Sequence, residues 1–271
     1  MKRILLVDAN YVCSRAFFAT GHLEFQGRGT GMALGAIETV ELCQERFGTN
    51  LTVLAFDSGK NKRREIYPAY KANRRENKTE EEIMIKRRYL KQIRIMPKIF
   101  RRMGYRNILS QRGYEADDLI ASVVRDEEGG KIVIVSADQD LWQLLWDNVI
   151  CYDPRAKKTT SRKSFLDEWG VVPEMWPHVK ALAGDTVDNV PGLKGVGLKT
   201  AAKYYVGALK SGSAAERTIE AGLAIHNRNL QLIRLPLEGT ASFDLVPDEV
   251  TAERRSFVMK KLGAAEKRWK R

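Results

Sequence analysis

The chain has 271 residues, a net charge of +12 and 44% hydrophobic residues. This length and composition allow a sizeable hydrophobic core, and no apolar run approaches the roughly 20 residues that a transmembrane helix requires. The three cysteines, Cys13, Cys43 and Cys151, and the three scattered histidines show no paired-ligand spacing, which excludes a disulfide framework and a zinc motif. We therefore expect reduced core thiols in a cytoplasmic protein.

Three continuous runs of Val, Ile and Leu predict buried parallel strands over residues 3–8, 51–57 and 131–138. Between them, apolar residues at helical spacing predict helices over residues 31–48 and 115–130. The alternation of strands and helices indicates an α/β fold with a parallel-sheet core.

The second half of the chain has a different character. From about residue 161 onward, strong strand signals are missing and the sequence is predicted to be mostly helical. We therefore expect two parts: an α/β core over residues 1–160 and a helical region over residues 161–271. No internal repeat or low-complexity linker separates them.

The positive charge is concentrated in residues 60–112, which contain eighteen Lys and Arg against five Glu. That segment carries +13, so the remaining residues together carry −1. A localised basic surface indicates a polyanionic partner, and we expect a nucleic acid. Within this segment, Thr79 and Glu82 have the spacing of a capping box, which predicts the start of a helix.

Each of the three predicted strands ends in an aspartate, and further acids follow at neighbouring positions. Because sites in open α/β sheets form at the carboxyl ends of the strands, we expect these acids to meet there. Two such charges 4 Å apart cost about 4 kcal/mol at an effective dielectric of 20, so the cluster requires bound cations or raised pKa values. Oxygen ligands select Mg²⁺ or Mn²⁺, and a pair of these ions suits phosphodiester hydrolysis. The nine acids are Asp8, Asp57, Glu115, Asp117, Asp118, Asp138, Asp140, Asp185 and Asp188.

The stretch "GDTVDNVPGLKGVGLKT", residues 184–200, superficially matches a nucleotide-binding P-loop. Gly192 and Gly197 have the required separation, but Leu198 intervenes before Lys199 and Thr200, and a predicted helix precedes the stretch instead of a strand. We therefore expect no nucleotide cofactor. A tight Gly-x-Gly turn within a helix–turn–helix unit over residues 174–208 would instead bring the backbone and a helix N-terminus close to a DNA phosphate.

The chain resembles the 5′-nuclease family of flap endonucleases, phage 5′–3′ exonucleases and the 5′-nuclease domain of bacterial DNA polymerases. The matching motifs span residues 4 to about 205 and are, in order, "LLVDAN", "AFD", "AYKANR", "YEADD", "SADQD" and "AGDTVDNVPGLKGVGLKTA". The resemblance implies two Mg²⁺ or Mn²⁺ ions, with Asp117 or Asp138 near both and Asp118 matching the second acid of the family's "ADD" motif. It implies a first ligand set of Asp8, Asp57, Glu115 and Asp117, and a second of Asp138, Asp140, Asp185 and Asp188.

The resemblance also assigns the basic segment and the glycine turn. It implies that residues 60–100 include a helical arch that admits single-stranded 5′ ends, with Lys71 and Arg74 at its base. Tyr70 would stack on a base there, although a packing role for this aromatic stays open. The helix–turn–helix is implied to be of the H3TH type, which holds duplex DNA and a K⁺ ion. The residues implied there are Gly195, Val196, Gly197, Lys199 and Thr200.

The sequence therefore predicts a divalent-metal-dependent 5′ nuclease, acting as a 5′–3′ exonuclease and flap endonuclease in replication or repair. Its expected partners are DNA with 5′ single-stranded ends or flaps and adjoining duplex, with RNA primers as a further substrate. We expect a monomer without membrane contact, in the cytoplasm or, if phage-encoded, the host cytoplasm. Two alternatives stay open: a non-catalytic branched-DNA-binding protein on this fold, and a PIN-type ribonuclease with a similar acidic sheet edge.

Overall fold

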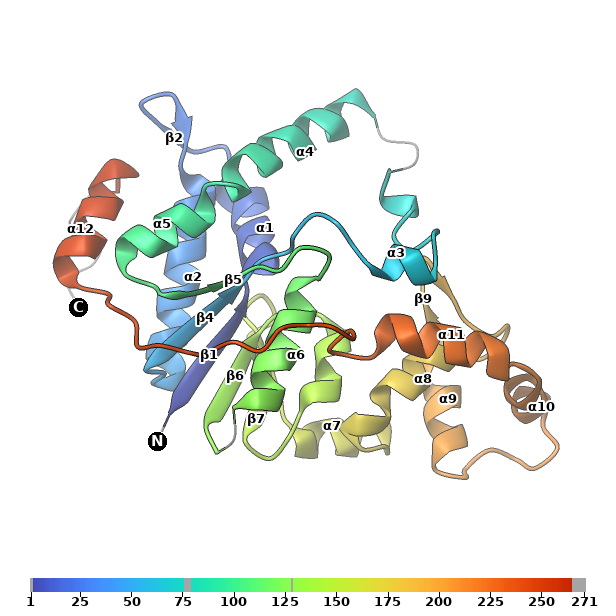
Figure 1. Cartoon of the computed structure of the whole chain (residues 1–271). Helices are drawn as coiled ribbons and strands as arrows, with labels where there is room; N and C mark the ends of the chain where they lie inside the picture. The colour runs from blue at the N-terminus through green and yellow to red at the C-terminus, as the bar shows by residue number, and fades with distance from the viewer. Residues whose placement is uncertain (1, 76–78, 128, 265–271) are drawn as a thin grey trace.

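A computed structural model describes residues 2–75, 79–127 and 129–264. Its centre is a six-stranded sheet in the order β5-β4-β1-β6-β7-β8, in which all neighbours are parallel except β7 and β8 (Figure 1). The predicted α/β fold with a parallel-sheet core is confirmed. The strands are β1 (Arg3–Asp8), β4 (Leu51–Ala55), β5 (Asn107–Leu109), β6 (Lys131–Val135), β7 (Val149–Asp153) and β8 (Lys158–Thr160).

The register of the central strands aligns their carboxyl ends. Asp8 in β1 is paired with Ala55 in β4, and Val7 is paired with Val135 in β6. The predicted strands 51–57 and 131–138 were too long, because the hydrogen-bonded ladder stops at Ala55 and Val135. Of the three aspartates expected at strand ends, only Asp8 belongs to a strand, and the other two stand in the loops that follow.

Helices cover both faces of the sheet and bury the apolar runs from both sides (Figure 1). Leu5 and Val7 pack into one core, whereas Ile4 and Leu6, which alternate with them, pack into the other. The first core is covered by α1 (Ala9–Thr20), α2 (Gly31–Phe47), α5 (Met96–Met103) and α12 (Ala252–Lys261). The second is covered by α6 (Ala116–Asp126), α7 (Arg162–Trp169), α8 (Trp176–Ala183), α9 (Leu198–Tyr205) and α10 (Ala214–Ala221).

The helices at the start of the basic segment lie above the carboxyl end of the sheet (Figure 1). The segment's longest helix, α4 (Glu80–Ile93), begins with the predicted capping box, in which Thr79 and Glu82 exchange hydrogen bonds. The predicted helix 31–48 is confirmed as α2, but the helix predicted over 115–130 ends at Asp126. The short elements of the amino-terminal half are β2 (Glu24–Phe25), β3 (Arg28–Gly29), α3 (Arg63–Ile66), η1 (Asn73–Arg75) and η2 (Gln139–Leu144).

The carboxyl-terminal part is mostly helical, as expected, and shares one apolar core with the sheet. A boundary at residue 160 remains a prediction. An extended segment over 236–250 returns along β5, where Asp248 accepts hydrogen bonds from Thr52 N (2.8 Å) and Arg106 N (3.1 Å). No described helix is long and apolar enough to cross a membrane. The remaining elements are η3 (Pro173–Met175), β9 (Gly184–Asp185), β10 (Val190–Pro191) and α11 (Leu223–Ile233).

Candidate functional site

Five carboxylates from four separate segments line one cleft of about 440 Å³ at the carboxyl end of the sheet. Asp8 caps helix α1: its Oδ1 accepts a hydrogen bond from Tyr11 N (2.9 Å) and its Oδ2 accepts one from Ser136 Oγ (3.0 Å). The five acids are Asp8 at the end of β1, Asp57 after β4, Glu115 and Asp117 at the start of α6, and Asp138 after β6.

The amino end of α6 positions two of these acids relative to each other. Asp57 Oδ1 accepts a hydrogen bond from Ala116 N at 2.9 Å, and Asp57 N donates to Asn10 Oδ1 at 3.1 Å. Asp117 follows Ala116 directly, so both carboxylates face the cleft. Ser136 connects a third, because its Oγ accepts from Asp138 N at 3.2 Å.

These acids interact strongly through their charges. The pKa of Asp8 is raised to about 7, first by withdrawal from water and then by repulsion from Asp57 and Asp138. Burial, and then the charges of Asp138 and Asp8, raise the pKa of Asp117 well above its ordinary value. A bound cation would relieve this repulsion, and a donor set made only of carboxylate oxygens fits Mg²⁺ or Mn²⁺. The donor chemistry of this cleft therefore suits a divalent metal ion, although the described side chains are not arranged as a ready-made ligand set.

Two lysines pair with four of the predicted acids: Glu115, Asp140, Asp185 and Asp188. The Lys180 ammonium, nearly buried, contacts Asp140 Oδ1 and lies 2.7 Å from Asp185 Oδ2. The Lys71 ammonium contacts Glu115 Oε1 and lies 3.4 Å from Asp188 Oδ2. Across the described ranges 2–75, 79–127 and 129–264, no group of three or more His, Cys, Asp or Glu side chains is arranged to hold a metal ion. The two four-acid ligand sets therefore stay predictions.

The predicted catalytic residues meet around Glu115 and Asp188. The hydroxyl of Tyr70 lies 2.9 Å from both Glu115 Oε2 and Asp188 Oδ2, and its ring is buried. Arg74 donates to Asp188 Oδ1 at 2.7 Å and keeps half of its side chain exposed. In this structure the buried ring and the two hydroxyl contacts of Tyr70 agree with the packing alternative left open above, and base stacking by Tyr70 stays a prediction.

Asp118 faces the opposite way from its neighbour Asp117. Both of its oxygens accept hydrogen bonds from the buried guanidinium of Arg63, each at 2.7 Å, and Oδ1 also accepts from Leu237 N at 2.9 Å. Arg63 in turn donates to Leu232 O at 2.7 Å, which ties α3 and α6 to the end of α11. Both oxygens of Asp118 are occupied inside the protein and Asp118 does not line the acidic cleft, so its ligand role stays a prediction.

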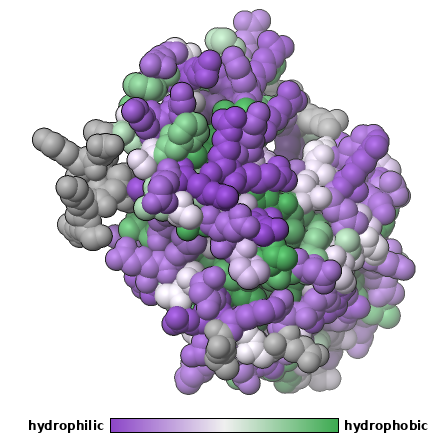
Figure 2. All heavy atoms as spheres, turned by 60° about the vertical axis from the view of Figure 1, so that its left-hand side comes forward, coloured by the Kyte–Doolittle hydropathy of each residue, from purple (hydrophilic) through white to green (hydrophobic). Residues whose placement is uncertain are grey.

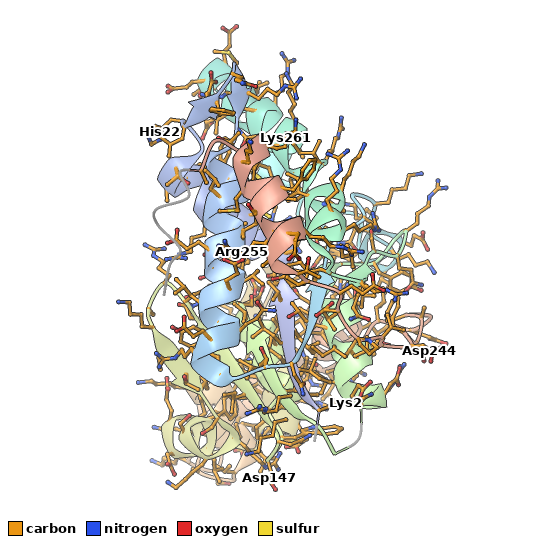
Figure 3. All side chains as sticks on the ribbon, turned by 90° about the vertical axis from the view of Figure 1, so that its left-hand side faces the viewer. Lys2, His22, Asp147, Asp244, Arg255 and Lys261 are labelled. Carbon is orange, nitrogen blue, oxygen red and sulfur yellow. The ribbon has the colours of Figure 1, made fainter. Side chains whose placement is uncertain are left out.

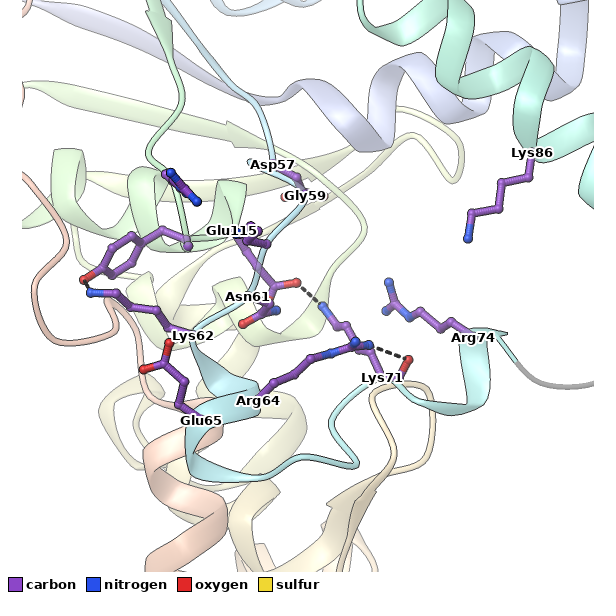
Figure 4. A pocket seen from close by; sticks show the side chains of 14 residues that line it. Asp57, Gly59, Asn61, Lys62, Arg64, Glu65, Lys71, Arg74, Lys86 and Glu115 are labelled. Carbon is purple, nitrogen blue, oxygen red and sulfur yellow. Dashed lines mark hydrogen bonds and ion pairs between the residues drawn. The ribbon is translucent and has the colours of Figure 1, made fainter.

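A larger cavity of about 710 Å³ opens beside the acids and is lined in part by residues of α3, η1 and α4. Figure 4 shows Lys71 directed at Glu115, and Arg74 and Lys86 directed toward each other from η1 and α4. Seven Lys and Arg residues line this cavity against three acids, so it is suited to phosphate groups. The seven are Lys60, Lys62, Arg64, Lys71, Arg74, Lys86 and Arg112.

The glycine loop joins α8 to α9 beyond a short ladder of β9 and β10, and it does not follow a strand of the main sheet. Gly195 has φ +79°, and Val196 is buried. Gly197 caps α9, with Lys199 and Thr200 in the first turn. Two hydrogen bonds join the segment before this loop to the segment of Ala69 and Lys71. Lys71 N donates to Asp188 O at 2.8 Å, and Asn189 Nδ2 donates to Ala69 O at 2.7 Å.

This arrangement matches a known family in sequence. The sequence model described as 5′–3′ exonuclease, N-terminal resolvase-like domain, matches residues 3–170. The chain belongs to the 5′–3′ exonuclease family. The resemblance inferred from the sequence motifs is thereby confirmed.

Members of the 5′–3′ exonuclease family differ in length. A 5′–3′ exonuclease of Aquifex aeolicus is 33% identical over 205 residues, which cover 74% of this chain and 68% of that protein. DNA polymerase I of Mycobacterium tuberculosis is 33% identical over 222 residues, which cover 77% of this chain and 23% of the polymerase. The chain thus spans less than a quarter of the length of such polymerases.

Solved structures with the same fold include nucleases with bound metal or DNA. Zinc-bound T5 5′-exonuclease has a TM-score of 0.75 and 21% identity, covering 97% of this chain and 98% of that one. Bacteriophage T5 D15 flap endonuclease, in a pseudo-enzyme-product complex with DNA and metal ions, has a TM-score of 0.75 and 20% identity, covering 97% and 100%. At these identities the similarity shows the fold.

Three site residues were missed by the sequence reasoning: Lys180, Arg63 and Ser136. Lys180 carried a usable signal, since it stands four residues after Trp176 on the apolar face of a predicted helix. A lysine on a buried face requires an acidic partner. Arg63 had no such signal, because it stands in a stretch that is basic throughout.

Proposed function

We propose that this protein is a divalent-metal-dependent 5′ nuclease that acts on DNA as a 5′–3′ exonuclease and flap endonuclease. The observation that carries the proposal is the cleft in which Asp8, Asp57, Asp117 and Asp138 meet beside a cavity rich in Lys and Arg. Acids repel phosphate, so an acidic cleft beside a phosphate-binding surface is unfavourable for binding alone. It is useful for hydrolysis with metal ions.

We infer that two Mg²⁺ or Mn²⁺ ions bind among these acids and their neighbours Glu115, Asp140, Asp185 and Asp188. When bound, such ions supply an activated water and stabilise the leaving oxygen. Lys71 and Arg74 stand where they can hold the scissile phosphate, since both reach the acids and line the basic cavity. Tyr70 keeps Glu115 and Asp188 in place through its hydroxyl.

The helix–turn–helix loop is proposed to hold the duplex beside the cut. Gly195 and Gly197 are exposed, and the amide groups at the start of α9 have no helical partners to bond, so the backbone of a duplex can approach closely. We further propose that carbonyl groups of Gly195, Val196 and Gly197 bind K⁺. The proposed substrate is DNA with a 5′ flap or a 5′ end, and RNA primers are a further proposed substrate. We propose that the protein acts as a monomer in the cytoplasm.

The decisive experiment compares Asp138→Asn with Asp147→Asn on a 5′-flap duplex in Mg²⁺ and in EDTA. Asp138 lines the cleft, whereas Asp147 is 98% exposed at the opposite end of the sheet (Figure 3). We expect Asp138→Asn to slow cleavage by about 10²–10³-fold, the scale of one lost electrostatic contact to a transition state. DNA affinity should stay equal or rise, and Asp147→Asn should behave as wild type.

Two outcomes would contradict the proposal. Full cleavage by Asp138→Asn would mean that the acidic cleft is not catalytic. Cleavage that persists in EDTA would remove the metal requirement. DNA binding without cleavage by the wild-type protein in Mg²⁺ would instead support the non-catalytic alternative, and preference for single-stranded RNA would support the PIN-type alternative.

A further inference from the structure

A second groove lies between α5 and α12, at the opposite side of the molecule from the helix–turn–helix loop (Figure 1). It encloses about 670 Å³ and is lined by Arg102 from α5 and by Glu253, Arg254, Phe257 and Lys261 from α12. None of these residues belongs to the acidic cleft or to the cavity beside it. The groove therefore needs an explanation of its own.

The groove is positively charged and its cations are accessible. Arg254 lies 3.3 Å from Glu249, but Arg102 and Lys261 make no ion pair with any residue in the described part of the chain. Both of these side chains are exposed. Figure 2 turns the side of the molecule that carries α12 toward the viewer, and hydrophilic side chains dominate the face that it shows. Such a surface is suited to an anionic partner.

An exposed aromatic ring lies among these cations. Phe257 is 55% exposed, whereas the next two residues, Val258 and Met259, are buried in the core. The Lys261 ammonium lies 5.8 Å from the centre of the Phe257 ring. A single exposed hydrophobic residue is ordinary. An aromatic face between cations in a groove, however, is the combination that binds single-stranded nucleic acid, through base stacking and phosphate contacts.

The helix that presents this ring is firmly attached to the fold. Arg255 points from α12 toward α2 and pairs with Glu41 at 2.7 Å (Figure 3). Val258 and Met259 pack in the same core as Met103 of α5. Because these contacts anchor α12 through its other face, substitutions in the groove itself should not disturb the fold.

A series of exposed cations on α4 and α5 extends from the candidate site toward this groove. It begins at Lys86 of α4, which lines the cavity of Lys71 and Arg74 (Figure 4). From there α4 and α5 follow one another toward α12 (Figure 1), a path of about 24 Å for sixteen residues at about 1.5 Å each. Exposed cations recur along it every three or four residues, and none is paired with an acid among the described residues: Arg87, Lys91, Arg94, Lys98 and Arg101.

We propose that the groove between α5 and α12 binds the part of a single-stranded 5′ end that lies farthest from the duplex, while the nucleotides next to the duplex are bound at the candidate site. The proposal rests on the proposed function and adds a location for the nucleotides beyond the arch. A single strand is favoured over duplex because only unpaired bases can stack on Phe257. It is favoured over an acidic peptide because exposed cations on α4 and α5 extend toward the groove from the site that is proposed to hold DNA.

The test measures affinity for flap duplexes whose 5′ flaps are about 3 or about 20 thymidines long, below and above the roughly 4–16 nucleotides of a typical single-strand site. Affinity is measured by fluorescence anisotropy in a buffer with EDTA, which prevents cleavage by removing divalent metal ions. The charge variant is Arg102→Gln with Lys261→Gln, and the stacking variant is Phe257→Ser. The control, Lys2→Gln with Lys131→Gln, removes two exposed cations at the opposite end of the sheet. All proteins keep residues 265–271.

We expect wild type and control to bind the long flap more tightly than the short one. Phe257→Ser should lose about fivefold or more for the long flap, the lower limit for one stacked base, and the loss should vanish when the flap is abasic. The charge variant should reduce the slope of log affinity against log salt for the long flap by about 1.4, or about 0.7 per phosphate contact. All proteins should bind and, in Mg²⁺, cleave the short flap equally.

Equal affinity of wild type for both flap lengths would overturn the inference, as would an equal loss in the control variant. Tighter capture of an acidic peptide than of the long flap, abolished by the charge variant, would assign the groove to a protein partner instead. Because short-flap cleavage is measured in parallel, failure of the groove proposal is distinguished from failure of the nuclease proposal.

Discussion

Lys71 illustrates how single residues balance charge in this site. Its ammonium lies between Glu115 and Asp188, and its backbone has φ +54°, which is uncommon for a residue with a side chain. Burial by itself raises the pKa of Glu115, but the charges of Lys71 and Arg63 outweigh it and leave that pKa below its ordinary value. Lys71 thus keeps an acid ionised while remaining beside the cavity that is suited to phosphate.

We predict that Lys71→Ala slows flap cleavage by about 10²–10³-fold but weakens DNA affinity only a few-fold, because its charge acts where negative charge develops. Lys71→Arg should recover part of the rate. The control is Lys60→Ala, because Lys60 lines the same cavity and makes no ion pair within the described part of the chain. Single-turnover rates and dissociation constants measured together decide the matter, and equal losses in both would make Lys71 an ordinary phosphate contact.

Asp117 and Asp118 show that adjacent acids can have unrelated tasks. Asp117 faces the cleft, whereas Asp118 is fully buried against Arg63. We predict that Asp118→Ala lowers the free energy of unfolding by about 3–5 kcal/mol, because it leaves a buried guanidinium without a counter-ion. Urea denaturation of Asp118→Ala and of Asp138→Ala tests this prediction. Asp138→Ala should unfold at the same urea concentration as wild type or at a higher one. Unchanged stability of Asp118→Ala would contradict the structural role of its pairing with Arg63.

At the scale of elements, the loop between α8 and α9 uses its glycines in two ways. Gly192 packs against the backbone of α8, where a Cβ would lie 2.0 Å from Ala183 O. At Gly197 no atom lies within 4 Å of a built Cβ, and the backbone has an ordinary negative φ. Gly192 is therefore needed for folding, whereas the fold itself does not require glycine at residue 197.

Gly197→Ala consequently tests DNA approach without straining the backbone, in contrast to Gly195, whose φ of +79° would add strain. We expect a loss of about tenfold in affinity for duplex-containing substrates, the size of one lost backbone contact of about 1.5 kcal/mol. Single-stranded 5′ ends should lose less. Gly130→Ala, at a position with ordinary contacts far from the loop, is the matched control. Unchanged duplex affinity of Gly197→Ala would mean that the loop does not grip the backbone.

At the scale of the whole molecule, charge is segregated: residues 60–112 carry +13 and the remainder carries −1. The fold places cations of this basic segment beside the acidic edge of the sheet, so a nucleic-acid backbone at the proposed site would contact cations next to the acids (Figure 1). Such a surface binds by releasing counterions from the nucleic acid.

We therefore predict that affinity for a flap duplex falls by about 10³-fold or more between about 50 and 200 mM salt, as for proteins that make about six or more phosphate contacts. ATP, titrated under the same conditions, should not bind, because the glycine loop lacks the register of a nucleotide cradle. A weak salt dependence, or micromolar ATP binding, would contradict the assignment of the basic segment and the loop, respectively.

The sequence by itself determined the elements that depend on local patterns. Apolar runs specified β1, β4 and β6, helical spacing specified α2, and the capping pair Thr79 and Glu82 specified the start of α4, because each signal lies within a few residues. The motifs also identified the family and the acids Asp8, Asp57, Asp117 and Asp138 that meet in the cleft.

Only the tertiary structure decided which partner each charged group meets. Asp118 pairs with a residue 55 positions away, and Lys180 pairs with Asp140, 40 positions away, in addition to the nearby Asp185. No local pattern contains the two distant partners. Adjacent residues at the start of α6 point about 100° apart around the helix axis, which sends Asp117 to the cleft and Asp118 to the core. The strand ends moved for the same reason: hydrogen bonding to a neighbouring strand, and not apolar character, decides where a strand stops.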